Sequence, residues 1–184
     1  SKYRGYLRMK KKSLFVLILF FAGCAEKEVH ALSNSNLAFN QLDGIHLGDK
    51  FDDVFKKNKN NIIVQNYKDI SNLKDCEKSK NLIINDNQTN VDVDKRGVVT
   101  AINTTNPNAI DANGISVGEN EKKLLKLKNI TKTKKMDAEE GGSYYEYKFL
   151  SQHSDSYYIY TANHQGKIDS IGLFSKDYIS CYED

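Results

Sequence analysis

The chain has 184 residues, enough for one domain with a proper core or for two small halves packed together. Hydrophobic residues make up 39% and charged residues 28%, a composition that excludes disordered and fibrous proteins. The net charge is +3, but residues 1–23 carry six of the 27 basic residues and none of the 24 acidic ones. The remaining 161 residues have a net charge of −3 and lack the basic footprint of a nucleic-acid-binding domain.

The first predicted element along the chain is a secretory signal. Three lysines at 10–12 precede an apolar run at 14–21, and an Ala-Gly pair separates this run from Cys24. A charged segment, a short apolar segment and small residues before a cut site define such a signal. The run is shorter than the roughly 18 residues that span a bilayer. We expect residues 1–8 to lie upstream of the native start and residues 1–23 to be removed.

The segment around Cys24 resembles the lipobox of bacterial lipoproteins, with Phe21 standing where that family usually has Leu. In that family the cysteine receives a diacylglycerol thioether, the peptide is cut before it, and the new amino group is acylated, as with palmitate. The resemblance therefore implies lipidation at Cys24 and a bacterial envelope location. Ala25 stands where enteric-type family members retained at the inner membrane have Asp, so the resemblance implies the outer membrane. We expect the domain to face the periplasm, and a surface orientation is the alternative.

Residues 24–40 are polar and without a periodic pattern, which predicts a tether of roughly 20 Å on a random-coil estimate. With Cys24 assigned to lipid, Cys76 and Cys181 remain, and an oxidising periplasm favours a disulfide between them. Metal ligation and a reactive thiol are the alternatives, but no histidine stands nearby at a ligand-like spacing.

Two glycine-containing landmarks recur at nearly constant spacing. Residues 43–48 are echoed 70 positions later, and residues 94–102 are echoed 69 positions later. We interpret this pattern as two tandem units, residues 41–106 and residues 107–184. Chance similarity between glycine-rich turns is the alternative.

Each unit predicts a short helix after its second turn glycine, followed by an antiparallel meander. The predicted strands are 82–85, 90–94 and 98–103 in the first unit, and 144–150, 157–162 and 168–174 in the second. The predicted fold class is α+β, with two tandem helix-plus-antiparallel-meander units forming one compact body. This pattern resembles the BamE/SmpA-type outer-membrane lipoproteins and the tandem-repeat β-lactamase-inhibitor proteins, as analogies of architecture that do not transfer function.

Motifs for catalysis are absent from the sequence: it has no nucleophile elbow, no zinc-protease motif, no phosphate-binding glycine loop and no dinucleotide fingerprint. A calcium loop beginning at Asp86 fails, because Val91 and Gly97 occupy its critical sixth and twelfth positions. We therefore expect no enzyme activity, no metal and no cofactor. An unrecognised catalytic site involving Asp92, Asp94 and His164 is the alternative. The other histidines are His30, His46 and His153.

Two surface features are candidates for binding. Six tyrosines fall on two strands predicted to be neighbours, and tyrosines left outside the core would form a rigid platform for a protein partner: Tyr144, Tyr145, Tyr147, Tyr157, Tyr158 and Tyr160. A purely structural cluster is the alternative, because tyrosine favours strands. A lysine-rich stretch at 122–135 predicts a solvated helix face and loop, or alternatively a contact with an anionic surface.

These features together predict a lipid-anchored periplasmic protein-binding domain. Within this class we favour an inhibitor or immunity protein that neutralises an envelope-acting toxin or hydrolase. An accessory structural lipoprotein of outer-membrane assembly or integrity is the alternative. The expected partners are the membrane, through the N-terminal lipid, and an envelope protein, but not nucleic acid.

Overall fold

The computed structural model describes residues 41–67, 70–84, 87–136, 142–151 and 155–182. The predicted signal peptide, the lipidation site Cys24 and the tether up to residue 40 lie outside these ranges, as do His30 and His153. All described elements belong to one unit, Asn34–Asp184. Within the described ranges, every helix is too short or too polar to cross a membrane.

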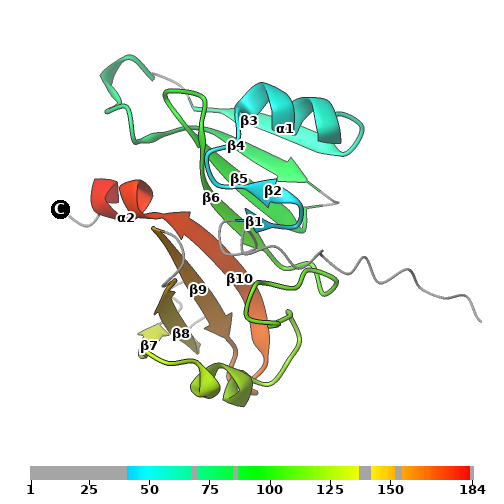
Figure 1. The fold of residues 1–184 in the computed structure, drawn as a ribbon, viewed down its shortest axis with the longest axis vertical. Helices are drawn as coiled ribbons and strands as arrows, with labels where there is room; N and C mark the ends of the chain where they lie inside the picture. Colours follow the sequence, from blue (N-terminus) through cyan, green and yellow to red (C-terminus); the bar gives the residue numbers. More distant parts are fainter. Residues whose placement is uncertain (1–40, 68–69, 85–86, 137–141, 152–154, 183–184) are drawn as a thin grey trace, which may run out of the picture. The chain divides into compact units, whose positions relative to one another are not determined.

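The main element of the fold is a single eight-stranded antiparallel sheet built from two four-stranded meanders (Figure 1). The first meander comprises β3 (Ile62–Asn66), β4 (Lys78–Ile84), β5 (Thr89–Asp94) and β6 (Val99–Thr104). The second comprises β7 (Ile130–Met136), β8 (Ser143–Leu150), β9 (Ser156–Ala162) and β10 (Ile168–Ser175). The strand order is β3-β4-β5-β6-β10-β9-β8-β7, so the pairing of β6 with β10 joins the two meanders.

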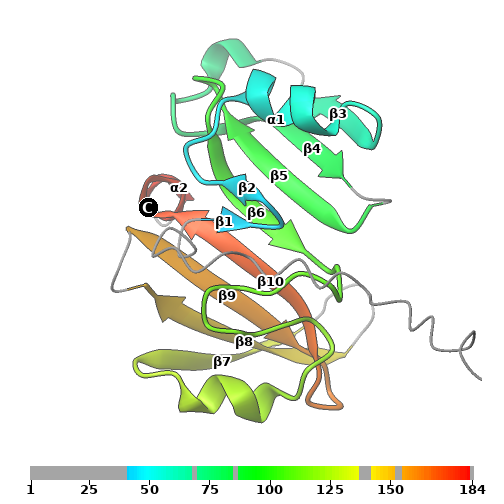
Figure 2. The same ribbon diagram turned by 45° about the vertical axis from the view of Figure 1, so that its right-hand side comes forward.

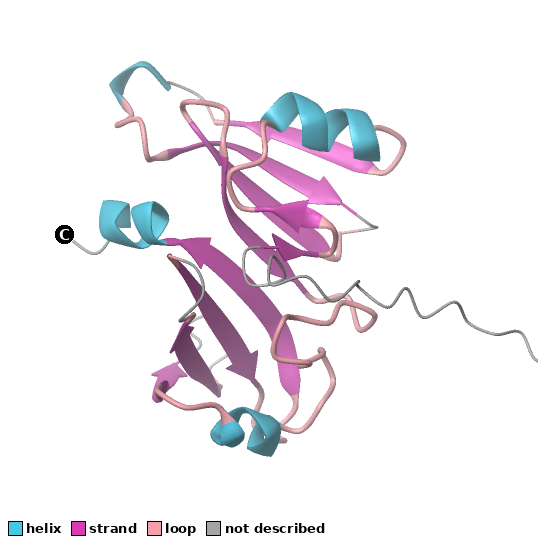
Figure 3. Ribbon diagram, viewed as in Figure 1, coloured by secondary structure: helices cyan, strands magenta, loops and turns pink. Residues whose placement is uncertain are grey.

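The remaining elements are short. They are the hairpin β1 (Gln41–Leu42) and β2 (Ile45–His46), the α-helices α1 (Phe51–Asn58) and α2 (Lys176–Tyr182), and the 3-10 helices η2 (Ile70–Asn72) and η3 (Glu121–Lys126). The predicted α+β class with two helix-plus-meander units is therefore wrong (Figure 3). The protein is mostly β, and the helix expected in the second half is a single 3-10 segment. The two meanders share one sheet because β6 and β10 pair along four residues each.

The hydrophobic core lies on one face of this sheet. Alternate residues of the central strands are fully buried, such as Leu82, Val91, Ile102 and Ile171. The covering layer contributes three groups of buried side chains: Leu42 and Ile45 of the hairpin, Val54 of α1, and Ala109, Ile115 and Leu124 of the segment after β6. An antiparallel sheet needs cover on only one face, so the other face is free for a second role.

The turns beside the two predicted helices use the same hydrogen bonds in both halves. The Gly48 amide donates to the Val99 carbonyl at 2.8 Å, and the Gly118 amide donates to the Ile168 carbonyl at 2.7 Å. Both glycines have φ near +90°, a conformation that side-chain-bearing residues rarely adopt. The echoed sequence landmarks thus form equivalent turns, and an internal duplication remains our interpretation of them.

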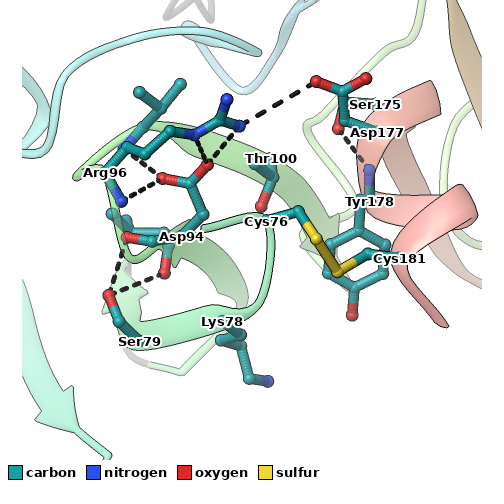
Figure 4. A network of polar contacts seen from close by, with 12 residues as sticks. Cys76, Lys78, Ser79, Asp94, Arg96, Thr100, Ser175, Asp177, Tyr178 and Cys181 are labelled. Atoms are coloured by element: carbon teal, nitrogen blue, oxygen red, sulfur yellow. Dashed lines mark hydrogen bonds and ion pairs between the residues drawn. A yellow bond between two sulfur atoms is a disulfide. The ribbon is translucent and has the colours of Figure 1, made fainter. Parts of the chain in front are cut away.

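The turn between β5 and β6 is organised by a buried carboxylate (Figure 4). Asp94 Oδ1 accepts the backbone N–H groups of Arg96 at 2.9 Å and Val98 at 3.0 Å. The Arg96 guanidinium neutralises this carboxylate, with Nη2 at 2.7 Å from Asp94 Oδ2. Asp94 therefore serves the fold, and the alternative that made it catalytic gains no support from its contacts.

The predicted disulfide is confirmed: Cys76 and Cys181 are bonded across a sequence separation of 105. Figure 4 shows that it attaches α2 to the segment that leads into β4. Helix α2 has no buried residue of its own. Its other tethers are aromatic and polar, including the Lys78 amide, which donates to the Tyr182 hydroxyl at 2.9 Å. The disulfide is thus the strongest single restraint on the position of α2.

Candidate functional site

The second face of the eight-stranded sheet, which we call the outer face, carries the side chains that alternate away from the core. Strand register places them in two rows that cross the sheet. The first row is Leu150, Tyr157, Phe174, Ala101, Asp92 and Asn81. The second row is Lys148, Ile159, Gly172, Asn103, Asn90, Ile83 and Ile63.

The outer face is unusually apolar for a surface that the core does not use. Leu150 is 46% exposed and Ile63 is 56% exposed, at opposite sides of the sheet. Between them, Ile83, Tyr157 and Ile159 are partly exposed. A sheet face that meets only water normally carries polar residues at its outward positions. Apolar groups rimmed by polar ones instead mark surfaces that bind something.

A hollow of about 220 Å³ lies near the middle of the outer face, and we call it the polar hollow. It is lined by Lys78, Asn81, Asn90, Asp92, Ala101, Asn103 and Phe174. Two small residues account for its position, because Ala101 and Gly172 are surrounded by longer side chains. A Cβ atom at residue 172 would lie 2.5 Å from Phe174 Cε2, so glycine is needed for the Phe174 ring to pack across this strand.

The polar groups of the hollow centre on Asp92. Its Oδ1 accepts the Asn81 side-chain amide at 3.2 Å and lies 3.2 Å from the Lys78 ammonium. The Tyr178 hydroxyl of α2 donates to Asp92 Oδ2 at 3.3 Å. The single side-chain oxygen of Asn81, Oδ1, is buried and has no hydrogen-bond partner among the described residues. A buried acceptor without a donor is costly, so this oxygen lowers the stability of the folded state.

Burial shifts the acid–base behaviour of this cluster. It raises the pKa of Asp92 above the ordinary value, although the neighbouring Lys78 charge opposes the shift. Burial, together with the Asp92 charge, raises the pKa of Tyr178 to about 12. The Tyr178 hydroxyl consequently keeps its proton at neutral pH and remains a donor to Asp92. This arrangement holds a fixed polar surface rather than a nucleophile.

Replacing Asp92 by Asn should change how stability depends on pH. Because the native pKa of Asp92 lies above its unfolded value of 3.8, the native state binds more protons between these two values. Asp92 therefore makes the free energy of unfolding fall as pH rises through that window. Urea unfolding of both proteins from pH 3.8 upward should show the wild type losing stability relative to Asp92→Asn. A difference between the two that stays constant with pH contradicts the shift.

The six predicted partner-binding tyrosines divide between the two faces. Tyr147, Tyr158 and Tyr160 are fully buried, so the prediction that they form a binding platform is wrong. Strand register sets Tyr160 beside Ile171, Tyr158 beside Leu173 and Tyr147 beside Tyr160, so all three side chains pack in the core. The Tyr158 and Tyr160 rings stack at 5.9 Å.

The other three tyrosines are partly exposed. Tyr144 and Tyr157 lie on the outer face, and the Lys148 ammonium sits 4.6 Å from the centre of the Tyr157 ring. Tyr145 lies on the core side near the sheet edge, with the Lys132 ammonium 3.9 Å above its ring. The platform predicted from the sequence is thus reduced to Tyr144 and Tyr157.

A second, larger hollow of about 360 Å³ lies at the β9–β10 turn and includes Tyr144 and His164. Its polar groups already serve the turn. Asn163 Nδ2 donates to Asp169 Oδ1 at 2.8 Å, and Asn163 Oδ1 accepts two backbone N–H groups. His164 is exposed and lies far along the sheet from Asp92, so the structure does not assemble the alternative catalytic group. Among the described residues, no three His, Cys, Asp or Glu side chains are grouped to hold a metal.

The polar hollow was missed at the level of sequence. Its signal is an amide or carboxylate at outward positions of three adjacent strands, namely Asn81, Asn90, Asp92 and Asn103. Each residue alone is typical of a solvated strand, and only the strand register brings the four together. No protein-family model, curated protein or solved structure significantly matches the chain.

Proposed function

We propose that this chain is a lipid-anchored envelope protein that binds a protein partner through the outer face. The observation that carries the proposal is the continuous pair of cross-strand rows in which apolar and aromatic side chains flank the polar hollow. Aromatic and apolar groups at the centre of a contact supply most of the binding free energy, while polar groups fix orientation. The pattern of residues 10–24 supports the lipid anchor at Cys24.

Within this class an inhibitor or immunity role against an envelope-acting toxin or hydrolase fits best. A rigid sheet held by a disulfide loses little conformational freedom on binding, which favours tight association. The binding surface consists of side chains fixed by strand pairing rather than of loops. An accessory role in outer-membrane assembly would use the same face on a different partner, so the identity of the partner distinguishes the two roles.

The test uses residues 34–184 as bait in envelope extract of the source cells. Leu150→Lys and Ile63→Lys place a charge at opposite sides of the outer face, and each should weaken capture of the specific partner at least tenfold. Ile110→Lys is the matched control, because Ile110 is 39% exposed but belongs to the segment that covers the core face. The captured partner, if it is a toxin or hydrolase, should lose activity on addition of wild-type protein.

Two results would count against the proposal. One is a partner that all three variants capture equally well, because binding would then not involve the outer face. The other is a natural protein whose Cys24 carries no lipid by mass spectrometry. Capture of envelope-assembly machinery in place of a toxin or hydrolase would favour the accessory role.

A further inference from the structure

One edge of the sheet carries a dense run of lysines. Residues 121–136 contain seven lysines and one acidic residue, Glu121. They form η3 and β7, and β7 is the terminal strand of the sheet. Figures 1 and 2 both show η3 beside β7, and the Lys132 ammonium lies 3.6 Å from the Glu121 carboxylate across this junction (Figure 2). The lysines therefore share one surface although they come from different elements.

Ion pairs between described residues neutralise only part of this charge. Lys123 pairs with Glu119 at 2.8 Å, and Lys135 lies 3.9 Å from Glu146. Four other lysines are exposed and make no ion pair with another described residue: Lys122, Lys126, Lys128 and Lys134. We call these four lysines, with Leu125 and Met136, the basic edge.

Two large apolar side chains project from the same edge. Leu125 is 59% exposed and Met136 is 70% exposed, the two highest values among the large hydrophobic residues described. Strand alternation puts Met136 on the same side of β7 as Lys132, which contacts η3. The apolar groups thus stand among the unpaired cations rather than on the outer face.

Protection of a sheet edge explains only part of this composition. Lysines on a terminal strand prevent unwanted pairing with another sheet, which accounts for those on β7. Edge protection does not account for Lys122 and Lys126 on η3, nor for the exposed Leu125 between them. Unpaired lysines around protruding apolar side chains are typical of segments that bind the interface of an anionic bilayer.

We propose that the basic edge docks on the surface of an anionic lipid bilayer, with its lysines at the phosphate groups and Leu125 and Met136 entering the interface. This contact is separate from the outer face and does not depend on the protein partner. Each lysine held near an anionic surface strengthens binding roughly fivefold. The unpaired lysines of the basic edge therefore give weak but measurable binding without any covalent lipid.

The experiment measures flotation of residues 34–184 with vesicles, since all described contacts lie within this unit and the N-terminal apolar run is excluded. The vesicles are phosphatidylcholine alone or phosphatidylcholine with about a third phosphatidylglycerol. We expect binding to the anionic vesicles only, with a loss in high salt. The double variant Lys126→Gln/Lys128→Gln should lower the binding constant about 25-fold, as two lysines of the stated strength require.

The matched control is Lys56→Gln/Lys57→Gln, which removes two adjacent exposed lysines from α1. It should bind anionic vesicles like the wild type. Leu125→Gln should weaken binding without changing its dependence on salt. The proposal is overturned if the wild type ignores anionic vesicles, or if the α1 variant loses as much binding as the basic-edge variant. Equal thermal unfolding of the variants shows that the comparison concerns the surface and not the fold.

Discussion

Replacing both Cys76 and Cys181 by Ala should lower the free energy of unfolding by about 4–5 kcal/mol in the chain-entropy model. The bond closes a loop with a sequence separation of 105, so its removal gives the unfolded chain much more freedom. The loss is a large share of the 5–15 kcal/mol that stabilises a typical domain. Urea unfolding of the oxidised wild type and of the double variant measures it.

Loss of the disulfide should also loosen helix α2 within the folded state. Helix α2 buries none of its residues, so without the bond its amides should exchange with solvent faster than those of β10, which precedes it. A reducing agent should reproduce the destabilisation in the wild type and have no effect on the double variant. A double variant within about 1 kcal/mol of the wild type would refute the expectation.

Removing the Tyr160 side chain should have the second large effect. Tyr160 is fully buried, and its hydroxyl donates to Asp111 Oδ2 while accepting the Asn113 side-chain amide at 3.0 Å. Tyr160→Ala should cost about 3–5 kcal/mol, as for other large core residues. Tyr160→Phe keeps the ring but withdraws a donor from a buried carboxylate, which should cost about 1–3 kcal/mol. Urea unfolding of both variants checks these values.

The stability cost of Tyr160→Phe should depend on pH, whereas a cost that comes from lost packing alone should not. Burial raises the pKa of Asp111 above 3.8, and the Tyr160 hydroxyl opposes this rise by donating to the carboxylate. Without the hydroxyl, the native pKa of Asp111 rises further above the unfolded value. The cost of Tyr160→Phe should therefore grow as pH increases above 3.8. Tyr157→Phe is the control, since Tyr157 is partly exposed and water can replace its contacts.

Strands with clear period-two alternation could be predicted from the sequence. In the segment at 157–162, Tyr158 and Tyr160 alternate with Ile159 and Thr161, and the structure has β9 at Ser156–Ala162. The disulfide was predictable because assigning Cys24 to lipid leaves two cysteines, which the expected oxidising compartment would favour as a pair. The turn glycines Gly48 and Gly118 were also visible as landmarks, and both have positive φ.

The edge strands were not predictable by the same reasoning. The β7 sequence, Ile130–Met136, carries lysine or threonine at most positions and buries little, so hydrophobic periodicity gives no signal. Strand β3 carries an apolar run of only three residues, Ile62–Val64, which is too short to show a period, and three of its five residues are exposed. Both edge strands form because their backbones hydrogen-bond to a neighbouring strand. That pairing depends on the assembled sheet and cannot be inferred from the sequence of the segment alone. The sequence consequently predicts a solvated helix face and loop for the lysine stretch, or a contact with an anionic surface, and gives no sign of a strand.

For the candidate binding site, the sequence predicted the residue type, tyrosine, but not which tyrosines lie on the outer face. The abundance of tyrosine in β8 and β9 pointed to the right half of the sheet, but alternation alone does not say which face meets the core. Register then assigned Tyr147 and Tyr160 to the core and left Tyr144 and Tyr157 outside. The polar hollow needs residues from β4, β5, β6 and β10, so it emerges only when the two meanders meet.

The junction of β6 with β10 also determines how the molecule comes apart. Separating the meanders would uncover two long backbone edges and split a set of buried side chains drawn from both. Either meander, expressed alone, would expose the unpaired backbone edge of β6 or β10. Such an edge pairs with strands of other molecules and promotes aggregation. The two halves of the chain are therefore expected to melt as a single cooperative block, despite a sequence that reads as two successive copies.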